Sequence, residues 1–293
     1  MLTRRRLLQS VTLSLLARPR RSQAAPVLRP SVHPLNHPAR CAGWWLASPL
    51  AGHAYWADLI HRRVGVTTGV TAGYGLQRST LRVGGLGEVS FDGVDDVVTL
   101  PDLLDNPTTM SLSCWVRYTT SARALVTKAI QYSAGGPCWY LRNHGGQVGF
   151  WYSQDDTTYR GGVSTAFVND DRWHHIAVAI AGMDPETAWM LWVDMQAQPL
   201  SIAGETAFSS GTITSLSNSE PVRLGGFGNG SDPYTGRLDD VRLAPIAWSA
   251  TDVQTLFQAP RQQYRGLLAA EVPLVGQAPV IDATTRPRGL LFQ

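Results

Sequence analysis

Three strand-like stretches, spread over much of the chain, constrain its fold more than any other feature. They are Val89–Leu100 (VSFDGVDDVVTL), Arg172–Ala179 (RWHHIAVA) and Thr235–Leu243 (TGRLDDVRL). The β-branched and aromatic residues of these stretches, and the Gly and Asp that punctuate them, are typical of strands in antiparallel sheets. Helical periodicity is almost absent elsewhere, so we predict an all-β fold.

The length and composition favour one large domain. The chain has 293 residues, of which 44% are apolar and 16% charged, and it shows no internal repeat. An all-β sandwich of about 200 residues or more commonly forms a single unit with one buried core. We therefore expect an antiparallel β-sandwich over residues 41–260, preceded by segments 1–25 and 26–40 and followed by a tail over 261–293.

Alternation and turn residues predict several individual strands. Met110–Arg117 alternates cleanly, so its even-numbered apolar residues should share one face. The dipeptide Asp92-Gly93 lies between two short runs and favours a hairpin, because Gly accepts a positive φ. Two further hairpins are expected, one through residues 143–146 and one through residues 183–186. The only helix that we expect is Ser249–Phe257, with Ser249 and Asp252 placed to form a reciprocal N-cap.

Together these features resemble the laminin-G-like, or concanavalin A-like, jelly-roll family. The resemblance rests on the three stretches, the strand Met110–Arg117 and the helix after Leu238–Arg242. It covers residues 41–260. It implies a jelly-roll sandwich in a family that consists mostly of binding modules. The family usually has an Asp-Gly turn where this chain has Asp194-Met195, so we expect this connection to be built differently.

The resemblance also implies a structural calcium site. Members of the family often bind one ion near the Phe-Asp-Gly turn and the Asp of the closing strand, and the matching residues are Asp92 and Asp239. Oxygen ligands of this kind suit calcium. The alternative is that Asp92 only shapes the turn and that Asp239 binds a loop.

A cluster of aromatic and polar residues predicts a ligand surface. Aromatic faces stack on sugar rings when polar groups nearby bind the hydroxyls. Alternation requires some of these side chains to point away from the core, whereas packing inside the core is the alternative for each of them. The candidates are Trp139, Asn143, Trp151, Tyr152, Asp155, Asp156 and Tyr159, and Tyr140 belongs to the same cluster in the sequence.

The sequence does not predict catalysis. Glycan hydrolysis on a sandwich needs two carboxylates that face each other across a cleft. The chain has five Glu residues and none is paired in this way, while its Asp-Asp pairs are neighbours that point to opposite faces of a strand. His174 and His175 have no recognisable Ser or Cys nucleophile near them in the sequence. We therefore expect a non-enzyme, and a secreted glycan hydrolase is the weaker alternative.

The three cysteines allow at most one intrachain disulfide. We expect Cys114 and Cys138 to be small buried apolar residues, and because both lie on predicted strands the alternative is a disulfide between them.

The two ends of the chain differ from its body. The first 40 residues hold eight Arg and no acidic residue, while the rest holds 17 basic residues against 22 acidic ones. An acidic body argues against nucleic acid binding by the domain. The start resembles a twin-arginine export signal with cleavage near Ala24, and the alternative is a basic arm that is retained. Its apolar run is too short to span a membrane.

We therefore predict a binding or adhesion module that recognises carbohydrate or a protein and is displayed outside the cell. A structural virion protein of a bacteriophage, assembled through the basic arm and the tail, is the alternative. Homo-oligomers or particle subunits are then the expected partners. The Pro-rich segment 26–40 and the tail should be extended, since Pro fixes φ and offers no hydrogen-bond donor.

Overall fold

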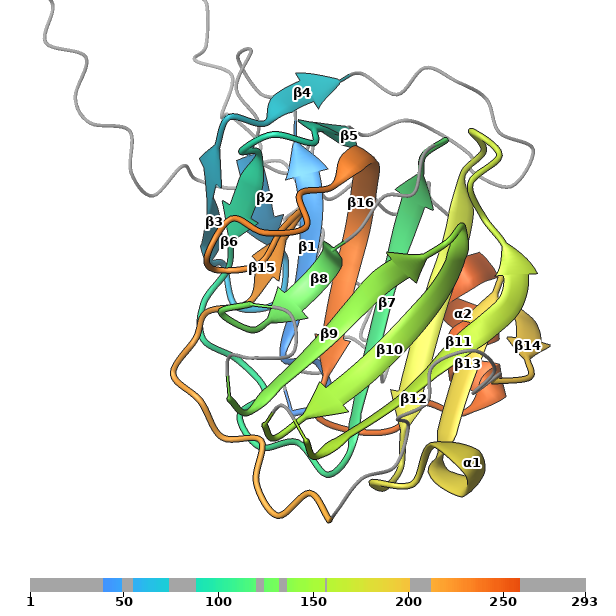
Figure 1. Cartoon of the computed structure of the whole chain (residues 1–293). Coiled ribbons are helices and arrows are strands. Elements are labelled where there is room, and N and C mark those ends of the chain that lie inside the picture. The colour runs from blue at the N-terminus through green and yellow to red at the C-terminus, as the bar shows by residue number, and fades with distance from the viewer. Residues whose placement is uncertain are drawn as a thin grey trace, which may run out of the picture.

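The computed structural model describes residues 39–48, 55–73, 88–119, 124–131, 136–155, 157–200 and 212–258. Within these ranges the chain forms 16 strands and two short helices. The strands form two facing antiparallel layers, so the predicted jelly-roll-type β-sandwich is confirmed (Figure 1). The predictions for the N-terminal arm and the C-terminal tail fall outside the described residues. No helix of the described ranges is long and apolar enough to cross a membrane.

The first layer, sheet A, has the hydrogen-bonded strand order β14-β13-β12-β7-β16-β1-β2. In that order its strands span Gln196–Gln198, Trp189–Val193, His174–Ile180, Met110–Arg117, Thr235–Ala244, Gly43–Ser48 and Tyr55–Asp58. Two further strands extend it, since β5 (Glu88–Asp92) pairs with the start of β16 and β4 (Thr71–Gly73) pairs with β5.

The second layer, sheet B, has the strand order β11-β10-β9-β8-β15-β6-β3. In that order its strands span Tyr159–Phe167, Gln147–Ser153, Cys138–His144, Ala124–Lys128, Arg223–Leu224, Val97–Thr99 and Val64–Thr68. The last of these, β3, pairs both with β6 and with β2 of sheet A, so it joins the two layers at one side of the sandwich.

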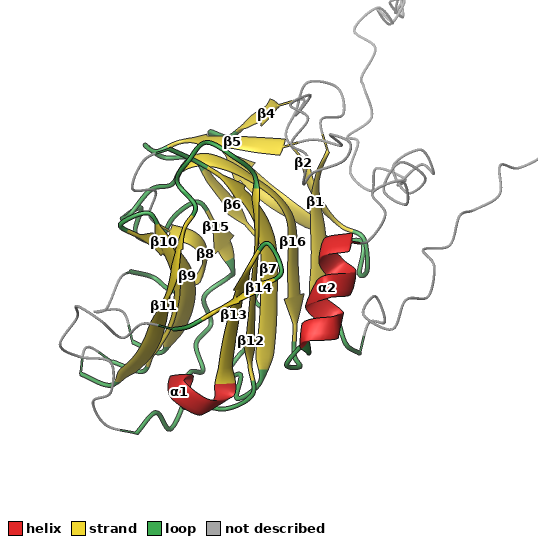
Figure 2. Cartoon of the chain, turned by 90° about the vertical axis from the view of Figure 1, so that its right-hand side faces the viewer, coloured by secondary structure: helices red, strands yellow, loops and turns green. Residues whose placement is uncertain are grey.

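The core lies between the layers and follows the alternation of the sequence. In β12, Ile176, Val178 and Ile180 point into the core, while Ala177 and Ala179 point outward. These small residues leave room for helix α2 (Ala250–Gln258), which packs on the outer face of sheet A (Figure 2). A strand that is apolar on both faces is expected in such a position between layers.

The helix and the two hairpins predicted from local sequence signals are present in the structure. The Ser249 hydroxyl accepts from the Asp252 amide at 3.2 Å, and the Asp252 carboxylate accepts from the Ser249 amide at 2.9 Å, which confirms the predicted cap of α2. Helix α1 (Pro185–Ala188) is a single turn inside the loop that joins β12 to β13. That loop and the turn at residues 143–146 close the two predicted hairpins, which the structure confirms.

The hairpin predicted around Asp92-Gly93 is wrong. Gly93 has the expected positive φ of 84°, but the strands on either side of the turn do not pair with each other. β5 pairs with β16 and β4 in sheet A, whereas β6 pairs with β15 and β3 in sheet B. The turn therefore carries the chain from one layer to the other.

The turn at Asp194-Met195 also differs from the expectation. Val193 pairs with Gln196, so β13 and β14 form a tight two-residue hairpin of the usual kind. Asp194 and Met195 have φ values of 51° and 69°, as a type I′ turn requires. The backbone keeps its shape although the sequence has Met at a position that favours Gly.

The cysteines are not paired with each other. Cys41, Cys114 and Cys138 are all free and buried. The expected burial of Cys114 and Cys138 is confirmed, and the alternative disulfide does not form, because Cys114 lies in the core whereas Cys138 lies on the outer face of sheet B. Burial raises the pKa of the Cys138 thiol to about 12, so this thiol stays protonated at neutral pH.

Candidate ligand-binding face

Sheet B has one face in the core and one face that points away from it. Because side chains alternate along a strand, Trp139 of β9 and Tyr152 of β10 enter the core, while their neighbours Tyr140 and Trp151 lie on the outer face. Helix α2 covers the outer face of sheet A, whereas neither described helix lies over the outer face of sheet B (Figure 2).

Aromatic rings gather on this outer face. We call Tyr140, Arg142, His144, Trp151 and Phe227 the outer-face cluster. The Tyr140 and Trp151 rings are nearly parallel, with an interplanar angle of 16° and centroids 5.5 Å apart. Phe227 meets Tyr140 edge-on at 5.4 Å. Such offset and edge-on arrangements are the favourable ones for aromatic pairs.

Two glycines make room for the Trp151 indole. A Cβ atom at Gly149 or at Gly161 would come within 2.2 Å of the indole ring. Gly149 lies two residues before Trp151 on β10, and Gly161 is its direct partner on β11. The ring therefore lies close against the backbone of both strands, where any side chain would exclude it.

Polar side chains border these rings. The Arg142 guanidinium lies 5.9 Å from the Trp151 ring centroid, within reach of a cation–π interaction, and the His144 ring lies 6.2 Å from it. Arg142 also forms an ion pair with Asp232 at 3.6 Å. Trp151 is 2% exposed and Tyr140 3%, while Arg142 and His144 are half-buried. The rings thus form an apolar floor, and the polar groups at its edge are Arg142, paired with Asp232, and His144.

The structure corrects two of the predicted ligand contacts. Trp139 is fully buried in the core, and its indole N–H donates to the Leu104 carbonyl at 3.2 Å. Tyr152 is equally buried, and its ring meets the Trp189 ring at 5.2 Å. A ring inside the core has no face for a ligand in solvent, so both residues serve the packing of the sandwich.

Asn143 is also structural rather than a ligand contact. It is 2% exposed, and its amide nitrogen donates to the Tyr118 hydroxyl at 2.5 Å. Its amide oxygen accepts from the Gly146 N–H at 3.1 Å, which closes the β9–β10 turn. Its side chain therefore has no accessible donor or acceptor for a ligand, which corrects the prediction for this residue.

The remaining predicted contacts lie at one end of β10 and β11. Asp155 accepts hydrogen bonds from the Thr157 and Thr158 amides, and the Thr157 amide is the main cause that lowers the pKa of this carboxyl. Tyr159 is partly exposed and pairs with Ser153, so it lies on the same outer face as Trp151. Asp156 lies outside the described residues.

The residues predicted for calcium are not brought together. Asp92 pairs with Thr235 on β16, so Asp239 lies four residues further along that strand, about 13 Å away at the usual rise of a strand. Asp239 is buried, and its carboxylate accepts from the Asp240 amide at 2.8 Å. The pairing of Asp92 with Asp239 is therefore wrong.

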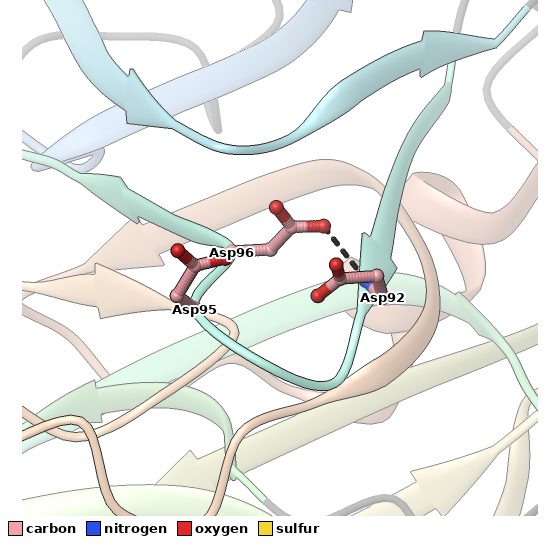
Figure 3. Close-up of side chains that lie close together, drawn as sticks. All are labelled: Asp92, Asp95 and Asp96. Carbon is pink, nitrogen blue, oxygen red and sulfur yellow. Dashed lines mark hydrogen bonds between the residues drawn. The ribbon is translucent and has the colours of Figure 1, made fainter.

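Asp92 instead lies beside two other carboxylates. Oxygen atoms of Asp92, Asp95 and Asp96 all lie within 4.8 Å of one another at the turn after β5 (Figure 3). An oxygen of the Asp96 carboxylate accepts from the Asp92 amide at 2.7 Å. Burial, with a smaller contribution from the charges of Asp92 and Asp95, raises the pKa of the Asp96 carboxyl.

A further ionisable site joins two loops at the start of β12. The Nδ1 atom of His174 lies 2.7 Å from an Asp194 oxygen, and its Nε2 atom lies 2.9 Å from an Asp170 oxygen. Both ring nitrogens are thus engaged by carboxylates, and neither is left to activate a nucleophile. The motif containing His174 was visible in the sequence, but its partners come from separate loops.

The sequence also missed three members of the outer-face cluster. Arg142 and His144 follow Tyr140 at two-residue steps, so the alternation of β9 places all three on one face. The alternation of β9 would therefore have indicated Arg142 and His144 once it was known that Tyr140 lies on the outer face. Phe227 reaches the cluster from the loop after β15, and no local pattern indicates this contact.

Comparisons with known proteins agree with the architecture. A family model for the concanavalin A-like lectin/glucanases superfamily matches residues 92–254, which is more than half of the chain. The binding domain of Paraclostridial Mosquitocidal Protein 1 superposes with a TM-score of 0.54 at 12% identity, over 75% of this chain and 52% of that one. The receptor binding domain of botulinum neurotoxin D superposes with a TM-score of 0.50 at 11% identity, over 77% and 53%.

These structural similarities show a shared fold. The chain spans about half the length of each of the two solved chains named above. A search among curated proteins found no match.

Proposed function

We infer that this chain, which belongs to the concanavalin A-like lectin/glucanases superfamily, is a non-enzymatic binding module for carbohydrate. The observation that carries this proposal is the outer-face cluster, where parallel Tyr140 and Trp151 rings are bordered by Arg142 and His144. Binding sites for sugars combine an apolar aromatic surface with a few fixed polar groups, and this face has both.

The geometry supports binding at the edge of the cluster rather than on the ring faces. Trp151 is almost fully covered, so it stiffens the floor and positions its neighbours. Arg142 offers N–H donors in a planar fork, and His144 offers a donor or an acceptor, for hydroxyl or carboxylate groups of a ligand. Tyr159 and Asp155 extend this polar edge toward the end of β10.

A glycan array screen of the purified protein tests the proposal. Arg142→Ala and His144→Ala should each weaken binding of a bound glycan by about tenfold, the loss of one or two hydrogen bonds. Arg172→Ala is the matched control, because Arg172 is 80% exposed and lies on the β11–β12 loop, outside the cluster. Circular dichroism should show that all three variants stay folded.

The outcomes separate the two ligand classes. Failure to bind any glycan, combined with capture of a protein partner that the same two variants abolish, would replace carbohydrate by protein as the ligand. Glycan binding that neither variant weakens would place the site elsewhere on the sandwich.

We propose that the module has no catalytic role. The engagement of both His174 nitrogens by aspartates supports this, because the ring lacks a free nitrogen to act as a base toward substrate. Incubation of the protein with any glycan that it binds should leave the glycan uncleaved by chromatography. Release of shorter products would favour the hydrolase alternative.

We further propose that the module is exported and displayed outside the cell. The support is the twin-arginine-like start of the sequence and the small residues before Ala25. The intact mass of the protein from its natural source tests this, with a chain that begins near Ala25 as the expected result. A chain that begins at Met1 or Leu2 and copurifies with a particle would favour the virion alternative.

A structural calcium ion is part of the proposal. Carboxylate oxygens within 4.8 Å of one another fit a hard cation, and Asp92, Asp95 and Asp96 would hold it. The pKa of the Asp96 carboxyl is raised mainly by burial and further by the charges of Asp92 and Asp95, and a cation bound to the three carboxylates would offset that repulsion. The ion would supply only charge compensation at the turn between the two layers.

A further inference from the structure

His174 lies between two carboxylates that belong to different loops. Its ring nitrogens lie 2.7 Å from an Asp194 oxygen and 2.9 Å from an Asp170 oxygen. A carboxylate oxygen only accepts, so both contacts are hydrogen bonds only if both ring nitrogens carry a proton. A neutral imidazole has one N–H, and therefore the arrangement needs the imidazolium form.

We propose that His174 is a pH-responsive clamp. In its charged form it ties the β11–β12 loop, through Asp170, to the β13–β14 turn, through Asp194, and loss of its proton releases one of these two bonds. This inference does not depend on the proposed ligand or on calcium.

The two aspartates also organise the backbone around the clamp. Asp194 accepts from the His175 amide at 2.8 Å through its second oxygen, and Asp170 accepts from the Arg172 amide at 3.0 Å. Each carboxylate is thus fixed on its own element. When the ring loses its proton, neither carboxylate faces a positive charge any longer, and one of the two loses its N–H donor altogether.

The loop that would be released has further anchors. Arg117 holds Asp171 through two side-chain bonds of 2.9 and 3.0 Å. The Val168 amide donates to the Gly146 carbonyl at 2.9 Å, and Gly146 belongs to the hairpin that carries His144. The clamp therefore controls how tightly this loop is held rather than whether it packs at all.

The charges around His174 favour its protonated form. The carboxylates in contact with the ring are those of Asp170 and Asp194, and a cation beside Asp170 is Arg172, whose mostly exposed guanidinium lies 3.7 Å from that carboxylate. Asp171 is neutralised by Arg117. Burial of the ring lowers its pKa, but the hydrogen bonds to Asp194 and Asp170 outweigh this and raise the pKa above its ordinary value.

The sign of the pH dependence follows. Because the folded-state pKa is raised, the clamp stabilises the fold fully below the unfolded pKa of about 6.5 and is lost as the pH rises through the folded value. The stabilisation is therefore expected to decline in the neutral to mildly alkaline range.

NMR titration of the histidine side chains, with His174→Gln to assign the resonance, measures the clamp directly. The pKa of His174 should lie above about 6.5, and Asp194→Asn should lower it by about one unit or more. Asp184→Asn, which removes an aspartate outside the contacts of the ring, is the control and should leave it unchanged.

Hydrogen exchange then tests the mechanical consequence. Between about pH 5.5 and pH 8.5, the protection factors of the Arg172 and His175 amides should fall about tenfold, while that of Val178 in the same strand stays constant. In His174→Gln this pH dependence should disappear. If that variant does not fold, the wild-type titration and Asp194→Asn still decide the matter. A His174 pKa at or below the ordinary value, or protection that does not change with pH, would overturn the proposal.

Discussion

The position of the Trp151 indole depends on the absence of side chains at two places. The ring lies against Gly149 on its own strand and Gly161 on the next, both too close for a Cβ atom. A glycine inside a strand weakens the strand, so its presence indicates a close approach by another group. At both positions the approaching group is the same indole, which builds the floor of the outer-face cluster.

Gly161→Ala should therefore displace the indole and destabilise the protein. The added methyl group would lie 2.2 Å from the ring, and overpacking of this kind costs about 1–3 kcal/mol. Urea unfolding followed by circular dichroism measures the loss. Gly226→Ala is the matched control, because no atom lies within 4 Å of the added group, and its stability should change by less than about 1 kcal/mol. Equal stability of both variants would mean that the indole is free to move.

At the level of single elements, the β13–β14 turn shows backbone geometry prevailing over residue preference. Asp194 and Met195 both have positive φ, and a Met in this region is disfavoured by contact between its Cβ atom and the backbone. Val193 and Gln196 nevertheless pair across the turn. Asp194 is fixed further by the His175 amide and by His174, which hold the turn in place.

Met195→Gly should stabilise the hairpin. Glycine adopts positive φ without strain, and after its greater freedom in the unfolded chain is subtracted a gain of about 0.5–1 kcal/mol is expected. Met190→Gly makes the same chemical change in the middle of β13, where it should instead cost about 1 kcal/mol. Thermal unfolding monitored by circular dichroism compares the two. A loss of stability in Met195→Gly as large as that in Met190→Gly would contradict this account.

The elements themselves were largely predictable, whereas their partners were not. Alternation located β7 and β12, and a Ser-Asp pair located the start of α2, because these signals are local. The Asp92-Gly93 dipeptide predicted a turn correctly but not its consequence, since the same local geometry can link strands in one sheet or in two. Alternation likewise predicted that Trp139 and Trp151 each lie on the opposite face of the sheet from their neighbours in sequence. It could not predict which of the two faces is turned toward the core.

On the scale of the whole molecule, the connections between the layers decide where charged groups meet. β3 pairs with strands of both layers, and the turn after Asp92 passes from sheet A to sheet B. The family resemblance pointed to an ion at Asp92 together with Asp239, but the strand register separates them. The carboxylates that do meet belong to one turn, so their proximity depends on how that turn bridges the layers.

Because the turn after Asp92 links the two layers, calcium bound there should raise the free energy of unfolding of the whole domain. An ion held by Asp92, Asp95 and Asp96 would bind only the folded chain, and at about a hundredfold excess over its Kd it would add about 2.7 kcal/mol. For a domain of this size the Tm in calcium should then exceed the Tm in chelator by about 5 °C or more. Asp95→Asn should remove most of this difference, whereas Asp184→Asn, outside the turn, should keep it. The contrary result would be a wild-type Tm that does not respond to calcium, together with a Tm in chelator that is higher for Asp95→Asn than for the wild type. It would mean that the three carboxylates repel one another and bind no ion.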